Sequence, residues 1–259
     1  MTRPFALLLP VVACLSGCGQ NQVAWEQSAR EEEAVKAIEA LGGKVIRNES
    51  LPGRPIYQVY LSCTKVTDSD MKDLKELKGF QALALEITQV TDAGLKDLKE
   101  LKGLRELNLG NTKITDAGLK DLKELKSLRE LNLRKTQITD TGLRELKELK
   151  GLRSLDLSHT QITDAGLKQL KELKDLCSLR LRNTHITDAG LKELTGLKGL
   201  QDLCLGFNHI TDAGLKELKE LKGLMSLELY HTHITDAGLK ELKQALPKTH
   251  IEWSHRPER

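Results

Sequence analysis

The sequence predicts an α/β solenoid, with a curved parallel β-sheet on the concave side and short helices on the convex side. A hexad, ITDAGL at residues 114–119, recurs with a period of 24 residues, and a fixed period of this length is typical of solenoids. Apolar residues alternate in one part of the unit and recur every third residue in another, which indicates one strand and one helix per unit. The hexads begin at Val66, Val90, Ile114, Ile138, Ile162, Ile186, Ile210 and Ile234.

The composition fits an aliphatic core between charged outer faces, because only 3% of the residues are aromatic and 30% are charged. The chain has 40 basic and 37 acidic residues, a formal net charge of +3. This balance excludes a strong electrostatic field for nucleic acid or anionic lipid. Acids and bases also interleave along the predicted helices, as in Lys120-Asp121-Leu122-Lys123-Glu124. That pattern favours a solvated face over a nucleic-acid stripe.

Residues 1–17 have the features of a secretory signal peptide. Arg3 supplies a positive charge, and an apolar run covers residues 5–15. Such a run is too short to span a bilayer. The alternative is a buried apolar N-terminal helix with two incidental cysteines.

The segment Leu15-Ser16-Gly17-Cys18 resembles a bacterial lipobox. This resemblance implies cleavage before Cys18 and lipidation of that cysteine, which would anchor the protein to a membrane. Residues 11–14 also fit the pattern, but cleavage there would fall inside the hydrophobic run, so Cys18 rather than Cys14 is the predicted anchor. Gly19 follows the cysteine, which resembles an outer-membrane address. We therefore expect an exported protein at the outer membrane or the periplasmic face rather than in the cytoplasm.

The next two segments are predicted to lead into the solenoid. Residues 18–27 would form a lipidated tether that reaches at most about 30 Å when extended. Residues 28–55 do not repeat and would cap the first core layer. Ser28 and Glu31 fit a capping box for a helix over about 29–41. Residues 44–48 and 56–61 flank a turn around Pro52-Gly53, which predicts a β-hairpin.

Residues 56–253 are predicted to form the solenoid, and residues 254–259 a frayed tail. Nine strands, counting those at 56–61 and 250–253, would be spaced about 4.8 Å apart and give a sheet roughly 40 Å long. Ile251 and Trp253 are expected to cover the last core layer. Glycines such as Gly142 lie one turn into each predicted helix, where glycine lowers helix stability. We expect them to permit close packing against the adjacent unit.

The spacing Leu104-x-x-Leu107-x-Leu109-x-x-Thr112-x-Ile114 resembles the leucine-rich repeat, whose characteristic segment is L-x-x-L-x-L-x-x-N-x-L. The resemblance covers residues 56–253 and implies a right-handed horseshoe arc. In that family the asparagine side chain bonds backbone groups of neighbouring turns. Here Asn208 holds the position in one unit, and threonine holds it in the others. Because threonine can satisfy fewer groups, we expect a less regular ladder.

The ITDAGL stretch is similar to the cysteine-containing repeat subfamily found beside F-box domains. That likeness implies an alternative function, as a substrate-recognition adaptor of a ubiquitin ligase. However, the chain has no F-box-like helical block, and its lipobox points to bacterial export. Tandem near-identical units also resemble repeat lipoproteins of environmental bacteria. The expected function is a non-enzymatic, monomeric protein-protein interaction module without a cofactor, lipid-anchored at the bacterial cell envelope.

Recognition is expected on the concave sheet, where strand residues other than leucine point away from the core. Their columns, which include Glu106 and Asn108, vary from unit to unit while the leucines do not. A recognition surface requires such variation, although drift on an idle surface would look the same. Phe207 and Tyr230 are rare aromatic residues near one end, and exposed aromatic residues are favoured binding anchors. The candidate binding residues are Glu130, Asn132, Arg134, Asp156, Ser158, His159, Arg180, Arg182, Phe207, Glu228, Tyr230 and His231.

Two clusters suggest other chemistry. His185, His209 and His233 share one column, where neighbouring imidazoles could bind a metal such as zinc, but no carboxylate accompanies them and a polar edge column is the alternative. Asp156, Ser158 and His159 contain the residue types of a nucleophilic triad. They are close neighbours on an open strand without an evident oxyanion pocket, so we predict no enzyme activity.

Overall fold

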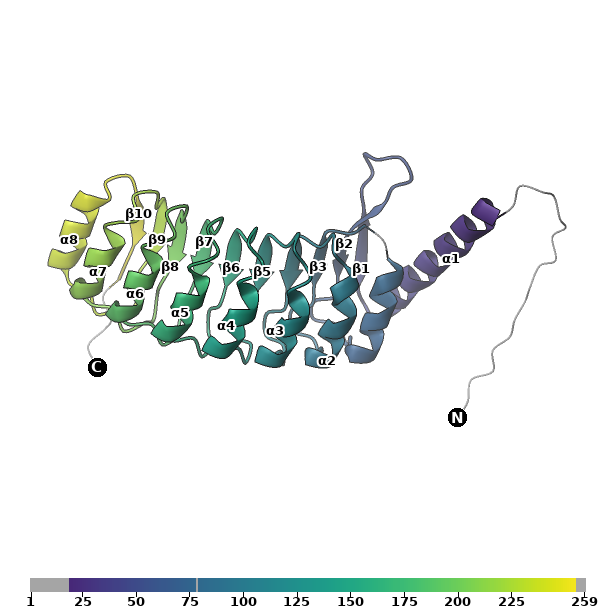
Figure 1. Cartoon of the computed structure of the whole chain (residues 1–259), viewed down its shortest axis with the longest axis horizontal. Coiled ribbons are helices and arrows are strands. Elements are labelled where there is room, and N and C mark those ends of the chain that lie inside the picture. The colour runs from purple at the N-terminus through teal and green to yellow at the C-terminus, as the bar shows by residue number, and fades with distance from the viewer. Residues whose placement is uncertain (1–18, 78, 255–259) are drawn as a thin grey trace.

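The computed structural model describes residues 19–77 and 79–254, and it describes side chains from residue 26 onward. The chain forms an elongated, gently curved, open array (Figure 1). The strands are β1 (Lys44–Arg47), β2 (Ile56–Tyr60), β3 (Ala82–Ala84), β4 (Glu106–Asn108), β5 (Glu130–Asn132), β6 (Ser154–Asp156), β7 (Ser178–Arg180), β8 (Asp202–Cys204), β9 (Ser226–Glu228) and β10 (His250–Glu252).

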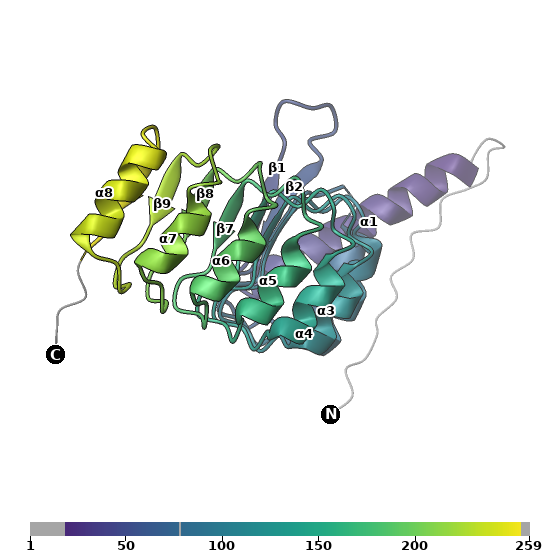
Figure 2. The same ribbon diagram turned by 60° about the vertical axis from the view of Figure 1, so that its left-hand side comes forward.

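Short helices cover one face of the sheet, and both views show them side by side along it (Figures 1 and 2). They follow the strands one by one, so each unit contributes one strand and one helical segment. The helices are α1 (Gly19–Ala40), the 3₁₀ helices η1 (Asp68–Glu76) and η2 (Lys96–Glu100), and α2 (Asp92–Leu95), α3 (Asp116–Leu122), α4 (Asp140–Leu146), α5 (Asp164–Leu170), α6 (Asp188–Leu194), α7 (Asp212–Leu218) and α8 (Asp236–Ala245).

The strands form a single sheet in chain order from β1 to β10. Strands β2 to β10 are parallel, and β1 pairs with β2 antiparallel as the predicted hairpin. The nine predicted solenoid strands are β2 to β10, and β1, the other strand of the predicted hairpin, extends the same sheet as a tenth strand. Every repeat interface has the same register, with the central leucines opposite each other, as for Leu107 and Leu131.

The core is a continuous stack of aliphatic side chains between sheet and helices. Leucines such as Leu107, Leu119 and Leu122 are almost completely buried. At the C-terminal end, Ile251 and Trp253 are partly buried and pack against this core, as predicted. Because each unit buries its leucines against its neighbours, stability depends on the stacking.

An aspartate-threonine ladder joins consecutive units at the helix N-termini. The Asp116 carboxylate accepts hydrogen bonds from Thr139 N at 2.8 Å and from Thr139 Oγ1 at 2.6 Å. Equivalent pairs extend from Asp68–Thr91 to Asp212–Thr235. A Cβ at Gly142 would overlap the Asp116 carboxylate. The repeated glycine is therefore explained by this close approach, which sharpens the packing expected from the sequence.

The threonine side chains make fewer bonds than the asparagine, as expected, but the sheet remains regular at these positions. Thr136 Oγ1 donates to Leu133 O at 2.6 Å, within its own unit, whereas Asn208 Nδ2 donates across the interface to Leu181 O at 2.7 Å. Strand register is nevertheless the same at both kinds of interface. The reason is that the sheet and the aspartate-threonine ladder already join the units.

Helix α1 begins at Gly19, ten residues before its predicted start, so Ser28 lies within the helix and is not its N-cap. No Gly or Pro interrupts the chain between residue 19 and residue 42, and helix formers such as Gln, Ala, Glu and Arg fill it. The prediction of an extended tether over residues 19–27 is therefore wrong. Ala34, Val35 and Ile38 anchor the C-terminal part of α1 to the core, and its other end projects beyond the solenoid (Figure 1).

Candidate functional site

The concave face is built from the first and third residues of the three-residue strands, since the second residue of β3 to β9 is a buried leucine. Most candidate residues therefore lie where the sequence predicts. Glu130, Asn132 and Arg180 occupy strand positions that face outward. Ser158 is different, because its side chain is 4% exposed. It is a short residue between Arg134 and Arg182 in the repeat column, so it adds little to the binding surface.

The N-terminal half of this face contains a hollow of about 320 Å³ that extends from β2 to β7. We call it the acidic hollow. Its low point lies over β3, where Ala82 and Ala84 stand in columns that carry longer side chains in most other units. Tyr60, which is 42% exposed, lines the end nearest the cap. The carboxylates and amides that line it are Glu106, Asn108, Glu130, Asn132 and Asp156.

Glu106 and Glu130 lie next to each other at the centre of the acidic hollow. They are register partners on β4 and β5, and neighbouring strands are about 4.8 Å apart. Burial raises the pKa of the Glu106 carboxyl above its usual value, and the neighbouring Glu130 carboxylate raises it further. Among the described residues, no basic side chain forms an ion pair with either carboxylate.

Short hydrogen bonds hold the polar residues at the ends of these strands. Oδ1 of Asn132 accepts from Arg134 N at 2.9 Å, and Oδ1 of Asp156 accepts from Ser158 N at 2.8 Å. Asn108 bonds Gly110 N in the same way and also donates to Glu86 at 3.2 Å. Such Asx contacts restrict the side chain to one orientation. The acidic hollow therefore presents preorganised polar groups.

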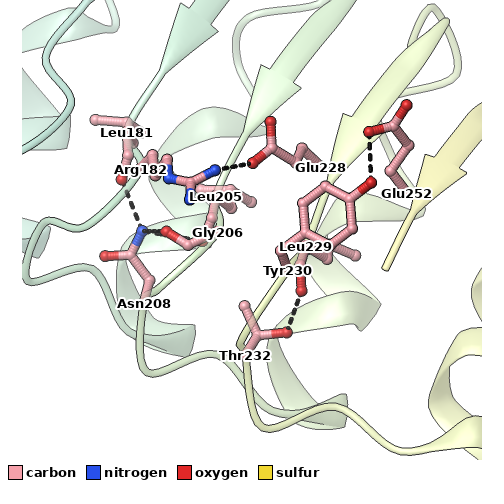
Figure 3. A network of polar contacts seen from close by, with 10 residues as sticks. All are labelled: Leu181, Arg182, Leu205, Gly206, Asn208, Glu228, Leu229, Tyr230, Thr232 and Glu252. Atoms are coloured by element: carbon pink, nitrogen blue, oxygen red, sulfur yellow. Dashed lines mark hydrogen bonds and ion pairs between the residues drawn. The ribbon is translucent and has the colours of Figure 1, made fainter. Parts of the chain in front are cut away.

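The C-terminal half of the concave face carries a bridged cluster instead (Figure 3). Arg182 forms an ion pair with Glu228 at 3.0 Å, and its guanidinium lies 4.5 Å from the centre of the Phe207 ring. Tyr230 donates a hydrogen bond to Glu252 at 2.8 Å, which raises the pKa of the Tyr230 hydroxyl. These contacts engage the aromatic side chains that the sequence indicated as free binding anchors.

His231 and Cys204 also belong to the bridged cluster. The rings of Phe207 and His231 are 4.3 Å apart between centroids. Burial, followed by the charge of Glu228, raises the pKa of the Cys204 thiol to about 12. Cys204 is therefore protonated and unreactive at neutral pH.

The structure does not assemble a catalytic triad. The Asp156 carboxylate accepts from the Ser158 backbone, and His159 Nδ1 contacts Asn183 Nδ2 at 2.9 Å. Burial and then the charges of Arg134, Lys135 and Arg182 lower the pKa of His159. The hydrogen bonds of these side chains thus hold the turn rather than activate a nucleophile.

The histidine column forms a stack at the edge of the sheet. The rings of His209 and His233 are 5.4 Å apart and nearly parallel, with an interplanar angle of 16°. His185 occupies the preceding position of the same column. Within the described ranges, no group of three or more His, Cys, Asp or Glu side chains is arranged to hold a metal ion. This arrangement gives the metal-binding alternative no support.

A column of residues in the left-handed conformation was missed from the sequence. It lies just past each strand, where the chain leaves the sheet, and its signal is the recurrence of Asn and His, which tolerate positive φ. Ile87 is the exception, because a β-branched residue is strained there; its φ is 57°. The column comprises Cys63, Ile87, Asn111, Lys135, His159, Asn183, Phe207 and His231.

The predicted lipidation site, Cys18, lies outside the described residues. None of the helices within the described part of the chain is both long and apolar enough to cross a membrane. The described cysteines Cys63, Cys177 and Cys204 are free thiols.

Comparison with known proteins supports the repeat architecture. A family profile described as a leucine-rich repeat region matches residues 81–251. Internalin C2 of Listeria monocytogenes is similar in structure, with 28% identity and a TM-score of 0.63; the alignment covers 77% of this chain and 81% of internalin C2. A leucine-rich repeat protein of Leptospira interrogans also has 28% identity, with a TM-score of 0.50 and coverage of 70% of this chain and 50% of that protein.

A search of curated proteins found no match. Leucine-rich repeat proteins typically act in protein-protein interaction and typically are not enzymes. The family match spans more than half of the chain, and the structural neighbours share the same strand-helix repeat. The chain belongs to the leucine-rich repeat family.

Proposed function

We propose that this protein is a non-enzymatic module that binds a protein ligand through its concave sheet while a lipid on Cys18 holds it at the bacterial cell envelope. The observation that carries the proposal is the acidic hollow, a recessed polar surface on a rigid sheet. Its lining residues change from unit to unit, but the leucines beneath them do not. Binding residues on a rigid scaffold lose little conformational entropy on association.

The proposed anchor rests on the lipobox-like residues 15–18. Helix α1 follows this segment directly and has 22 residues, which gives it a length of about 33 Å. Its C-terminal part packs against the core through Val35 and Ile38. A rigid helix of this length would hold the concave sheet away from the lipid surface, where a protein ligand can reach it.

Site-directed photo-crosslinking tests the binding surface. A photoreactive amino acid at Asn132, inside the acidic hollow, should give covalent protein adducts in envelope preparations. The same amino acid at Arg144, on the helical face of the corresponding unit, serves as the control and should give none. Equal adducts at both positions, or adducts only at Arg144, would remove the concave face from the proposal.

Metabolic labelling with an alkyne fatty acid tests the anchor. Label and membrane association should be lost in Cys18→Ser and retained in Cys14→Ser. Retention of the label in Cys18→Ser would show that the anchor is elsewhere. A soluble, unlabelled wild-type protein would favour the F-box-type adaptor reading over export.

A further inference from the structure

We propose that the acidic hollow takes an extended segment of the partner protein in which a lysine or arginine and an apolar residue are separated by one residue. This inference rests on the proposed function and adds the chemistry of the ligand. Three features of the hollow support it: two neighbouring glutamates without an ion pair, an apolar end, and the spacing of the strands.

Charge complementarity selects the basic residue. Glu106 and Glu130 face the same space, and among the described residues neither forms an ion pair. By contrast, Glu228 at the other end of the concave face has its own cation in Arg182. An ammonium or guanidinium group from a partner would sit between the two glutamates and remove their mutual repulsion. An anionic ligand would add to that repulsion.

The apolar end selects the second residue. Ala82 and Ala84 leave the floor low over β3, with Leu83 buried between them. Tyr60 borders this end; the residue is 42% exposed, and its hydroxyl donates to Gln58 Oε1 at 2.8 Å. An aliphatic side chain lying on the two alanines against the Tyr60 ring would be removed from water on several sides.

Strand spacing sets the distance between the two residues. The midpoint of the glutamate pair lies between β4 and β5, one and a half strand spacings from β3, which is about 7 Å. In an extended peptide, side chains on the same face are two residues apart, also about 7 Å. A segment crossing the strands would therefore place a basic side chain between Glu106 and Glu130 and an apolar side chain over β3. Both chain directions satisfy this spacing.

The volume of the hollow agrees with two side chains rather than a larger ligand. At about 320 Å³, it is at the small end of the range for ligand pockets, roughly 300–1,000 Å³. The polar groups of Asn108 and Asn132 lie beside the glutamates. The Asn132 amide, whose Oδ1 accepts from Arg134 N, is placed to donate from Nδ2 to the backbone of the bound segment.

Selection from a displayed library of random peptides tests the inference. The library is panned against the wild type, against Glu106→Gln/Glu130→Gln, and against Glu193→Gln/Glu217→Gln, which removes two carboxylates from neighbouring helices on the convex face. The wild type and the convex variant should enrich peptides with a basic residue and an apolar residue two positions apart. Binding of synthetic versions to the concave variant should fall about tenfold or more, since a charge-assisted contact becomes a neutral one.

A second variant separates the two halves of the motif. Tyr60→Ala should keep the preference for a basic residue and relax the preference for an apolar one. Circular dichroism checks that each variant is folded. The inference is overturned if enriched peptides lack basic residues, bind the concave variant equally well, or do not arise at all. Concentration-dependent self-association that competes with the peptides would also overturn it, in favour of a second copy of this chain.

The two proposals fail in different ways. If crosslinks from Asn132 form but the selected peptides lack the basic and apolar pair, the concave face binds protein and the ligand chemistry is wrong. If neither crosslinks nor peptides are found, binding through the concave face is itself wrong.

Discussion

In the C-terminal half of the concave face, the charged and aromatic side chains contact one another, whereas in the N-terminal half two glutamates share a hollow and, among the described residues, neither forms an ion pair. Arg180 lines the β7 end of this hollow. Arg182 forms an ion pair with Glu228 in the first region (Figure 3), and its guanidinium also lies over the Phe207 ring. Glu106 and Glu130 lie side by side in the second. The backbone is the same in both, so the difference is due to the side chains alone.

This difference indicates how one repeat can serve two purposes. Side chains whose interactions are satisfied within the protein add to its stability and have little left to offer a ligand. Side chains held close to like charges reduce stability and gain most when a ligand supplies the opposite charge. We propose that the C-terminal half serves stability and the N-terminal half serves recognition. Four substitutions test the energetic side of this contrast.

The largest effect is expected at Asn208, which lies under the bridged cluster and is 2% exposed. Its side chain donates to Leu181 O and Leu205 O and accepts from Thr184 and Ile186. Asn208→Ala should lower the free energy of unfolding by about 3 kcal/mol, because several buried groups lose their partners. Urea denaturation measures this loss.

Thr160→Ala is the matched control, since Thr160 makes one bond, to Leu157 O at 2.6 Å, within its own unit. It should lower the free energy of unfolding by about 1 kcal/mol. Similar losses for the two variants would show that the asparagine does not add cross-unit stability.

Arg182→Ala should have the next largest effect. It removes both the ion pair with Glu228 and the contact with the Phe207 ring, and should reduce stability by about 1 kcal/mol. Arg180→Ala, two residues earlier at the end of β7, should change stability by less than about 0.5 kcal/mol. If the two arginine variants lose the same stability, the C-terminal cluster is not a stabilising device.

Ile87→Asn should raise stability by about 0.5–1 kcal/mol, because asparagine tolerates the left-handed conformation and isoleucine does not. Ile87 has φ 57° and is 49% exposed, so few packing contacts are lost. The reverse change in the same column, Asn111→Ile at φ 53°, should lower stability by a similar amount. Thermal unfolding of both variants checks the sign, and a loss at both positions would contradict the strain at Ile87.

Glu106→Gln should give the smallest effect, a gain of a few tenths of a kcal/mol at pH 7, from relief of the repulsion with Glu130. Because the folded state raises the pKa of Glu106, its protonated form is favoured by folding. The wild type therefore loses stability as the pH rises through that pKa. The gain of the variant should vanish at about pH 3.5, below the unfolded value of roughly 4.3.

Urea denaturation at the two pH values measures this difference. Glu217→Gln, on helix α7, is the control and should show no such dependence. A gain of equal size at both pH values would mean that repulsion is not its source. Together with weaker peptide binding, the expected result would show that one residue favours recognition at the expense of stability.

Much of the fold could be predicted from the repeat, because each leucine position has one role in every unit. The concave columns could also be placed, since side chains alternate along a strand. The ion pair between Arg182 and Glu228 could not be predicted in this way, because the two residues are 46 residues apart and meet diagonally across two interfaces between repeat units. The positions of residues in their columns do not reveal the side-chain conformations that bring Arg182 and Glu228 together. The sequence therefore predicted that Phe207 and Tyr230 are available to a ligand.

Two other features could have been predicted from the sequence: the bond between Asp116 and Thr139, and the start of α1 at Gly19. Asp116 and Thr139 recur as a fixed polar pair in the units, and an unchanging polar pair in an otherwise charged and variable exterior indicates a structural bond. The helical start at Gly19 is indicated by the absence of a helix breaker before Gly42. A capping-box pattern at Ser28 was outweighed because helix formers precede it.

The period, the strand and helix in each unit, and the leucines that face the core can be read from the order of residues within one unit. The hollow, acidic N-terminal half of the concave face and the bridged C-terminal half arise only in the folded array. A hollow depends on the heights of side chains from several units at once, as at Ala84, Glu106 and Glu130. Likewise, the pKa of Glu106 depends on its burial and on a carboxylate from the next strand, so both properties arise only when the units stack.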